Sequence, residues 1–158
     1  MILVTLGTQD KTFIRLLEKI DDLIEKGLIK DHVVVQAGYT KYHSSNMEVF
    51  DLISQDDFNS LMAKADIIIT HGGVGSIISA LEKGKKVIAV PRLAKYGEHI
   101  NDHQTQIVSK FNSLGYLIGL QEVDELESAL KKIKKFQPKP FIHDNSKMIN
   151  LVSKLIDN

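Results

Sequence analysis

The sequence contains no cysteine and no tryptophan among its 158 residues, and it has only 3 prolines. Without cysteine the chain has no disulfide framework, no thiolate zinc site and no cysteine nucleophile. Basic and acidic side chains balance at 20 each, so the chain also lacks the net positive charge with which many proteins attract a nucleic-acid backbone. We therefore expect no nucleic acid as a partner.

Long apolar runs are absent as well. Stretches such as Ala65–Thr70 fall far short of the roughly 20 residues that a membrane-spanning helix needs. The opening run Met1–Leu6 is too short for the apolar core of a signal peptide. These absences predict a cytoplasmic protein whose contact with a membrane would be superficial or provided by a partner.

What the chain does contain is a regular alternation of two patterns. Short, nearly unbroken apolar runs are typical of strands buried on both faces of a parallel sheet. They occur at Ile2–Leu6, His32–Gln36, Asp66–Thr70, Lys86–Val90 and Tyr116–Leu120, with a weaker candidate at Val49–Ile53. Helical spacing predicts helices over Phe13–Ile24, Phe58–Lys64, Ser76–Lys83, His103–Asn112 and Glu122–Lys135. The alternation predicts an α/β fold: a single Rossmann-like, doubly wound parallel sheet with helices on both faces.

The length and the pattern predict a single domain over residues 1–158. Its α/β core is expected in residues 1–135. The remaining residues, 136–158, begin with Phe136–Phe141, whose two prolines exclude a helix and indicate an extended connector. A last helix is predicted over Ser146–Ile156.

Glycine-bearing polar turns follow several predicted strands, at the edge where open parallel sheets bind ligands. They are Gly7-Thr8-Gln9, Gly38-Tyr39-Thr40, His71-Gly-Gly-Val-Gly-Ser76 and Pro91-Arg92. In the third turn the glycines let the backbone approach a ligand, and the helix that follows directs free amides at an anion such as a diphosphate. The alternatives are that these glycines only shape and pack the turn, and that His71 only bonds to backbone.

The glycine spacing differs from two common phosphate-binding motifs. No G-x-G-x-x-G follows the first predicted strand, and the turn before Ser76 lacks the lysine of a P-loop. Binding of a nicotinamide dinucleotide and hydrolysis of ATP are both less favoured for this reason.

A second group of polar residues lies between Arg92 and Gln104, and it consists of Glu98, His99, Asn101, Asp102 and His103. Two histidines at i and i+4 without a nearby third ligand make a weak metal site, so we expect no metal. We favour contact with a polyhydroxylated ligand, because the Gln104 amide can both donate and accept. The alternative is a solvated helix N-cap around Asn101 and Asp102.

Taken together, these motifs resemble the C-terminal, donor-binding half of GT-B glycosyltransferases of family 28. The resemblance rests on His71-Gly-Gly-x-Gly-Ser76, on the spacing from Gly84 to Pro91 and on Asp102-His-Gln104, and it extends from Ile2 to about Leu120. Within this group the sequence looks closest to short bacterial subunits of capsular or exopolysaccharide synthesis. It is also similar to the small catalytic subunit of the dolichol-linked GlcNAc transferase.

The resemblance implies a function: the donor-binding catalytic subunit of an inverting transferase that uses a UDP-sugar as substrate and needs no cofactor. It would add a hexose (galactose, glucuronic acid, glucose or GlcNAc) to a lipid-linked acceptor in bacterial capsular or exopolysaccharide synthesis. Because a GT-B enzyme has two Rossmann-like domains, a separate membrane-anchored, acceptor-binding subunit is implied, which would hold this chain at the inner face of the membrane. The alternatives are a non-catalytic nucleotide-binding regulatory or assembly module, or a nucleotide-sugar epimerase or hydrolase.

The resemblance also implies which residues form the site. The donor-binding set is Gly7, Thr8, Gly72, Gly73, Val74, Gly75, Ser76, Glu82, Arg92, His103 and Gln104. Within it, the glycine turns surround the diphosphate, and Gln104 with His103 faces the sugar. The catalytic candidates are Gln104 and His71, the latter as a base. Relatives commonly carry a ribose-binding Glu where this chain has Ser79, and Glu82 is the candidate substitute.

Overall fold

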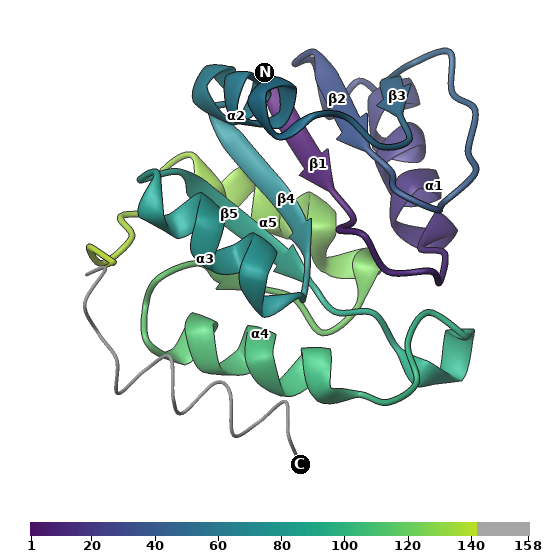
Figure 1. The fold of residues 1–158 in the computed structure, drawn as a ribbon. Coiled ribbons are helices and arrows are strands. Elements are labelled where there is room, and N and C mark those ends of the chain that lie inside the picture. Colours follow the sequence, from purple (N-terminus) through teal and green to yellow (C-terminus); the bar gives the residue numbers. More distant parts are fainter. Residues whose placement is uncertain (142–158) are drawn as a thin grey trace.

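Six parallel strands form one sheet between two layers of helices in the computed structural model, which describes residues 1–141 (Figure 1). The strand order is β3-β2-β1-β4-β5-β6. The strands are β1 (Ile2–Thr5), β2 (Val33–Gln36), β3 (Glu48–Phe50), β4 (Ile67–His71), β5 (Lys86–Val90) and β6 (Ile118–Gly119). The predicted doubly wound α/β fold is confirmed.

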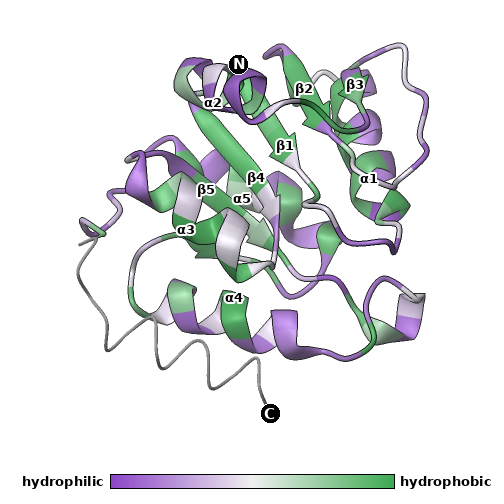
Figure 2. Ribbon diagram, viewed as in Figure 1, coloured by the Kyte–Doolittle hydropathy of each residue, from purple (hydrophilic) through white to green (hydrophobic). Residues whose placement is uncertain are grey.

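Alternating side chains of the strands supply two apolar cores, one on each face of the sheet. Helices α1 (Ile14–Glu25) and α5 (Leu126–Ile133) cover the face that carries Val4 and Ile69. The opposite face is covered by α2 (Gln55–Lys64), α3 (Val74–Glu82) and α4 (His103–Ser113). Figure 2 shows hydrophobic strands at the centre and helices of mixed hydropathy around them. The site is thus carried by a sheet that is packed on both sides.

Several boundaries differ from the prediction. Helix α3 begins at Val74, two residues before the predicted start at Ser76, because Gly73 takes an extended conformation and serves as the N-cap. The weak strand candidate is the short edge strand β3. The predicted helix Glu122–Lys135 is divided into a 3₁₀ turn, Val123–Glu125, and α5.

The connector after α5 forms neither helix nor strand as far as Phe141, and the prediction that its prolines exclude a helix holds there. The predicted helix over Ser146–Ile156 lies outside the described residues. Within residues 1–141, no helix has both the length and the apolar character required to cross a bilayer.

The strand order reverses between β1 and β4. From β1 the chain proceeds outward through β2 to β3, and it then returns to the other side of β1 to form β4, β5 and β6. Connections that leave β1 and β4 on opposite sides open a crevice at the carboxyl ends of these strands. A ligand site is therefore expected at this edge of the sheet.

Candidate functional site

The glycine turns that follow β1, β2 and β4 pack against one another. A Cβ atom on Gly7, which has a φ of 71°, would lie 2.5 Å from Nε2 of His71. A Cβ atom on Gly38 would lie 2.5 Å from the carbonyl oxygen of Gly7. The expected convergence of these turns on one edge of the sheet is confirmed.

Packing accounts for two of the three glycines between His71 and Ser76. A Cβ atom on Gly72 would lie 2.8 Å from Cβ of Gln104, and one on Gly73 would lie 2.5 Å from Cε1 of His71. Gly75 is different, because an added Cβ would meet nothing within 4 Å. The interior of the protein therefore gives no reason for glycine at position 75, and the space in front of it is open.

A cavity of about 250 Å³ lies in front of Gly75, at the point where the strand order reverses. It is lined by Thr5, Thr8, Gln36, Leu52, Ile53, Gln55, Phe58, Gly75, Ser76 and Ser79. No side chain caps the start of α3. The amides of its first turn and the positive end of the helix dipole are thus left for an external partner. Among the described residues, those that line this cavity carry no charge.

His71 is the last residue of β4 and is 3% exposed. Its Nδ1 accepts a hydrogen bond from Nε of Arg92 at 3.2 Å, and its Nε2 lies 3.2 Å from Oγ of Ser76. Burial lowers the pKa of His71 to about 3, and the positive charge of Arg92 contributes in the same direction. The predicted role as a base is not favoured, because the only lone pair of the neutral ring is already occupied.

Arg92 follows β5 and is 1% exposed, so it does not line the cavity. Its guanidinium donates to the carbonyl oxygens of Leu6 at 2.6 Å and Lys11 at 2.8 Å, and it stacks 5.4 Å from the centre of the Phe13 ring. Burial lowers the pKa of Arg92 to about 10, which leaves it cationic at neutral pH. The structure places this residue beneath the turn that follows β1. Direct contact with the donor stays a prediction.

Gln104, in the first turn of α4, is also buried. Its Oε1 accepts from the backbone amides of Gly72 and Arg92, each at 3.0 Å, and its Nε2 lies 3.4 Å from Nδ1 of His71. The side chain therefore joins the loops that follow β4 and β5. Its predicted contact with the donor sugar stays a prediction, and the observed role is structural.

In the loop before α4, the acids and amides of the second polar group bond to backbone, and their contact with a polyhydroxylated ligand stays a prediction. Asn101 Oδ1 accepts from the amide of His103, as in the N-cap alternative, whereas Asp102 Oδ1 accepts from the amide of Ala94. His103 is half-buried at the first position of α4. In residues 1–141, no three His, Asp or Glu side chains gather in a way that could hold a metal ion.

The remaining predicted residues are Thr8, in the turn after β1, and others at the start and along α3. Thr8 and Ser79 line the 250 Å³ cavity, and Val74 is the first residue of the helix. Glu82 lies one turn beyond Ser79 and lines a neighbouring cavity with it. The substitution of Glu82 for a ribose-binding Glu stays a prediction.

Some residues of the site were not predicted. Gln36 accepts from the Thr5 hydroxyl at 2.8 Å and donates to the carbonyl oxygen of Gly7. Arg15, which was also missed, holds the predicted residue Glu98, 3% exposed, through contacts of 3.0 and 3.1 Å. A polar residue at the end of an apolar run was a usable signal for Gln36. No spacing signal links Arg15 to Glu98, because 83 residues separate them.

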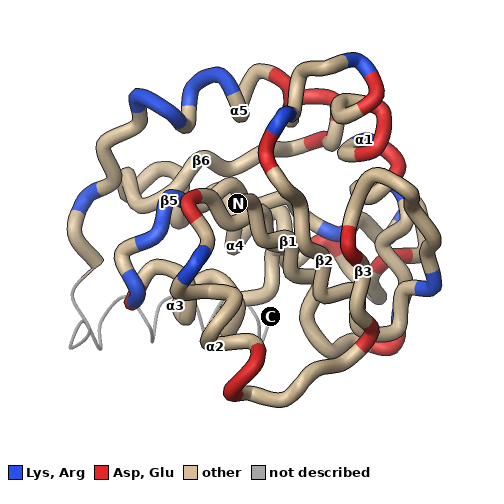
Figure 3. The backbone as a smooth tube through the Cα atoms, turned by 90° about the horizontal axis from the view of Figure 1, so that it is seen from above, with Lys and Arg blue, Asp and Glu red and all other residues tan. Residues whose placement is uncertain are grey.

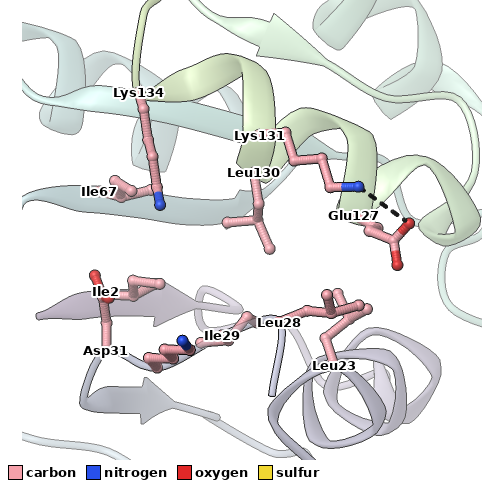
Figure 4. A pocket seen from close by; sticks show the side chains of 11 residues that line it. Ile2, Leu23, Leu28, Ile29, Asp31, Ile67, Glu127, Leu130, Lys131 and Lys134 are labelled. Atoms are coloured by element: carbon pink, nitrogen blue, oxygen red, sulfur yellow. Dashed lines mark ion pairs between the residues drawn. The ribbon is translucent and has the colours of Figure 1, made fainter. Parts of the chain in front are cut away.

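Another cavity, of about 310 Å³, lies at the opposite edge of the sheet, next to Ile2 and Ile67 at the starts of β1 and β4 (Figure 4). Leu130 of α5 and Leu28 form part of its apolar lining, and Lys131 of α5 is paired with Glu127. Its described lining contains no glycine, in contrast to the lining of the cavity beside Gly75. We therefore assign the candidate site to the carboxyl edge.

Residues 1–157 match the glycosyltransferase family 28 C-terminal domain. The chain belongs to this family. The resemblance that the motifs indicated is confirmed.

Named relatives agree with the family. The UDP-N-acetylglucosamine transferase subunit ALG13 of Candida glabrata is 36% identical over 70 residues, which are 44% of this chain and 33% of the relative. ALG13 of Candida albicans is 26% identical over 113 residues, 72% of this chain and 37% of the relative. The chain thus spans about a third of the length of these curated relatives.

Solved structures share the fold. The solution structure of ALG13 superposes with a TM-score of 0.64 at 20% identity, covering 99% of this chain and 96% of that one. The glycosyltransferase of kitacinnamycin has a TM-score of 0.61 at 19% identity, but only 37% of that chain is covered against 97% of this one. The fold therefore corresponds to one Rossmann-like half of a GT-B enzyme.

Proposed function

We propose that this chain is the donor-binding subunit of an inverting, UDP-sugar-dependent glycosyltransferase. The observation that carries the proposal is the uncapped start of α3, which opens into an uncharged cavity beside Gly75. Helix-terminal amides bind phosphate groups without the help of a metal ion. The names of the ALG13 relatives support UDP as the nucleotide and GlcNAc as one candidate sugar.

The cavity has a part suited to each half of a nucleotide. Phe58, Leu52 and Ile53 provide apolar surface for a base, and Ser76 with the first amides of α3 provides donors for the diphosphate. When the bond between the sugar and the phosphate breaks, negative charge grows on the departing UDP. Donors fixed in advance at that position stabilise this charge.

An inverting displacement also needs a base for the acceptor hydroxyl. His71 has its lone pair engaged by Arg92, so we assign the base to a second, acceptor-binding subunit. The rim of the carboxyl edge supports such a partner. It exposes large apolar side chains after β2, β3 and β5, including Ile100 at 80% exposure, together with Tyr39, Leu52 and Tyr96.

The proposal also covers the acceptor, the cellular location and the donor sugar. We propose a lipid-linked sugar acceptor and a membrane-anchored partner at the inner face of the membrane, in bacterial capsular or exopolysaccharide synthesis. The donor sugar is one of galactose, glucuronic acid, glucose and GlcNAc. The proposed reaction involves no metal.

The first experiment measures binding of UDP, ADP and GDP to the full chain by calorimetry, with amide NMR shifts to locate the site. UDP binding that shifts Gly75 and Ser76 would support the proposal. The Ser76→Ala variant should weaken binding, whereas Ser128→Ala, at an exposed position of α5, should not. Failure of UDP to bind, or shifts confined to the amino edge, would reject it.

The second experiment adds the acceptor-binding partner and a lipid-linked acceptor, with the four UDP-sugars as donors. Transfer that requires both chains is the expected result. UDP binding without transfer would instead identify a non-catalytic module. Conversion of the UDP-sugar by the isolated chain would identify an epimerase or hydrolase.

A further inference from the structure

Three side chains from three different elements form a continuous line of hydrogen bonds that ends in the cavity. Arg92, after β5, donates from Nε to Nδ1 of His71 at the end of β4. Nε2 of His71 lies 3.2 Å from Oγ of Ser76 in α3. A guanidinium can only donate, so Nδ1 of His71 must accept, and the neutral ring carries its proton on Nε2. The direction of every bond in the line is therefore fixed.

This direction determines what Ser76 can do. Because its oxygen accepts from His71, its hydroxyl hydrogen is free to turn away from the ring, towards the cavity that Ser76 lines. His71 itself is buried and does not line that cavity. Ser76, rather than His71, is thus the member of the line that can reach a ligand.

We propose that Arg92, His71 and Ser76 form a relay of hydrogen-bond donors that orients and polarises the Ser76 hydroxyl towards a phosphate oxygen at the start of α3. Arg92 and His71 are positioning residues, and Ser76 is the residue that contacts the ligand. The identity of this anion as the diphosphate of a nucleotide rests on the proposed function.

The buried position of the cation explains why a relay is needed. The guanidinium is fixed by the carbonyl oxygens of Leu6, Lys11 and Glu98, so it cannot move out to meet an anion. Hydrogen bonds in a buried line strengthen one another, and bonds from a charged donor are the strongest. The relay thus gives an uncharged cavity part of the effect of a positive charge.

The surroundings of His71 keep the ring neutral and in one tautomer. Nε2 of Gln104 lies 3.4 Å from the same Nδ1, so two donors face this atom. Burial, followed by the charges of Arg92 and His99, lowers the pKa of His71. The polarity is opposite to that of a Ser-His-Asp triad, in which a carboxylate prepares the histidine to remove a proton from serine. Ser76 is therefore a donor and not a nucleophile.

The first test needs no nucleotide. Long-range ¹H–¹⁵N NMR of the imidazole ring should show His71 in the full chain as neutral, with the proton on Nε2, from pH 8 to pH 5. In Arg92→Met, the His71 ring should no longer keep its proton on Nε2 alone, and it should become doubly protonated at a higher pH than in the unmodified chain. The Arg15→Met variant is the matched control, because Arg15 contacts Glu98 but not His71. A proton on Nδ1 in the unmodified chain, or an unchanged ring in Arg92→Met, would overturn the relay.

The second test is a double-mutant cycle on UDP affinity. We expect Ser76→Ala to weaken UDP binding about tenfold and Arg92→Met about fivefold. In the Ser76→Ala background, Arg92→Met should change affinity less than about twofold, because the relay has lost its end. Ser76→Thr, which keeps the hydroxyl, should restore most of the affinity. Equal effects of Arg92→Met in both backgrounds would refute the relay.

The relay can still be tested if Arg92→Met does not fold or if UDP does not bind. If Arg92→Met does not fold, His71→Phe replaces it in the cycle with the same expectation, since it also removes the donor to Ser76. If UDP does not bind at all, the proposed function fails, while the ring NMR still decides whether Arg92 sets the tautomer of His71.

Discussion

Two helix ends at the amino edge of the sheet differ from the start of α3 at the carboxyl edge. At the amino edge, Nζ of Lys85 donates to the carbonyl oxygens of Ala63 and Ala65 at the end of α2, and Lys86 donates to Lys134 just after α5. Looking along the strands onto this edge, Figure 3 shows the lysines of α5 and of the turn between α3 and β5 gathered on one side. Helix ends there are satisfied from within the protein.

At the carboxyl edge, α2 and α3 themselves differ. The hydroxyl of Ser54 caps α2 by accepting from the amide of Asp57, whereas Gly73 leaves the start of α3 without a side-chain cap. An unsatisfied helix start beside a cavity costs free energy unless water or a ligand completes it. A binding site is therefore better recognised by helix amides that the fold leaves without a partner than by the volume of a cavity.

The largest effect is expected from Gln104→Ala at the carboxyl edge. It removes the acceptor of the buried amides of Gly72 and Arg92, which should lower the free energy of unfolding by about 2–5 kcal/mol. Denaturant unfolding measures this loss. Gln106→Ala, at an exposed position of the same helix, is the control. Equal midpoints for both variants would contradict the structural role.

Under conditions in which Gln104→Ala folds, sugar transfer should fall more than UDP binding if Gln104 also contacts the sugar.

The next largest effect is expected from Gly75→Asp, which places a carboxylate in open space at the start of α3. UDP affinity should fall by about 100-fold or more through repulsion of the diphosphate, with little change in melting temperature. Gly75→Ala should be as stable as the unmodified protein or slightly more stable. Gly73→Asp should also abolish binding, but it displaces His71 as well. Unchanged UDP affinity in folded Gly75→Asp would remove the ligand from this cavity.

A smaller effect concerns pH. The folded protein holds the pKa of His71 near 3, below the value of about 6.5 in an unfolded chain, so the unfolded state binds a proton first as the pH falls. Between pH 6.5 and about 3, the unmodified protein should therefore lose about 1.4 kcal/mol of stability per pH unit relative to His71→Gln. Unfolding curves at pH 7, 5.5 and 4.5 measure this difference. Parallel pH dependence of the two proteins would show that His71 is not buried as a neutral ring.

The smallest effect is expected at the amino edge. Lys85→Met removes two hydrogen bonds to the end of α2 and should cost about 1 kcal/mol of stability, with UDP affinity unchanged within about twofold. Lys83→Met, at an exposed neighbouring position, should change neither property. A large loss of UDP affinity in Lys85→Met would show that the two edges are not independent.

The fold could be predicted from the sequence because its signals are local. The central apolar runs, such as Ile2–Leu6, are each short enough for one strand and are buried over nearly their whole length, whereas the edge runs Val49–Ile53 and Tyr116–Leu120 are less buried. The start of α3 was misplaced by two residues, because a glycine N-cap has no side chain to mark it. The 3₁₀ turn before α5 was missed for a similar reason, since it continues the helical spacing.

The site could be predicted only in part. Residue type located the glycine turns and the polar group before α4. It could not show that Arg92 and Gln104 point inward, because their partners, Leu6 and Gly72, are 86 and 32 residues away in the chain. Nor could it separate Gly72 and Gly73, which packing requires, from Gly75, which packing does not. Those distinctions depend on contacts between elements, which spacing along the chain does not encode.

The absence of charged side chains from the described lining of the cavity beside Gly75 has a consequence for the conditions under which the protein would work. Dissolved ions screen exposed charges over about 8 Å at physiological ionic strength, but they act weakly on hydrogen bonds in a recess and on a buried guanidinium. Retention of a nucleotide by such a site would vary little between dilute buffer and concentrated potassium chloride. A protein of this kind could hold its substrate steadily while the osmotic state of a cell changes.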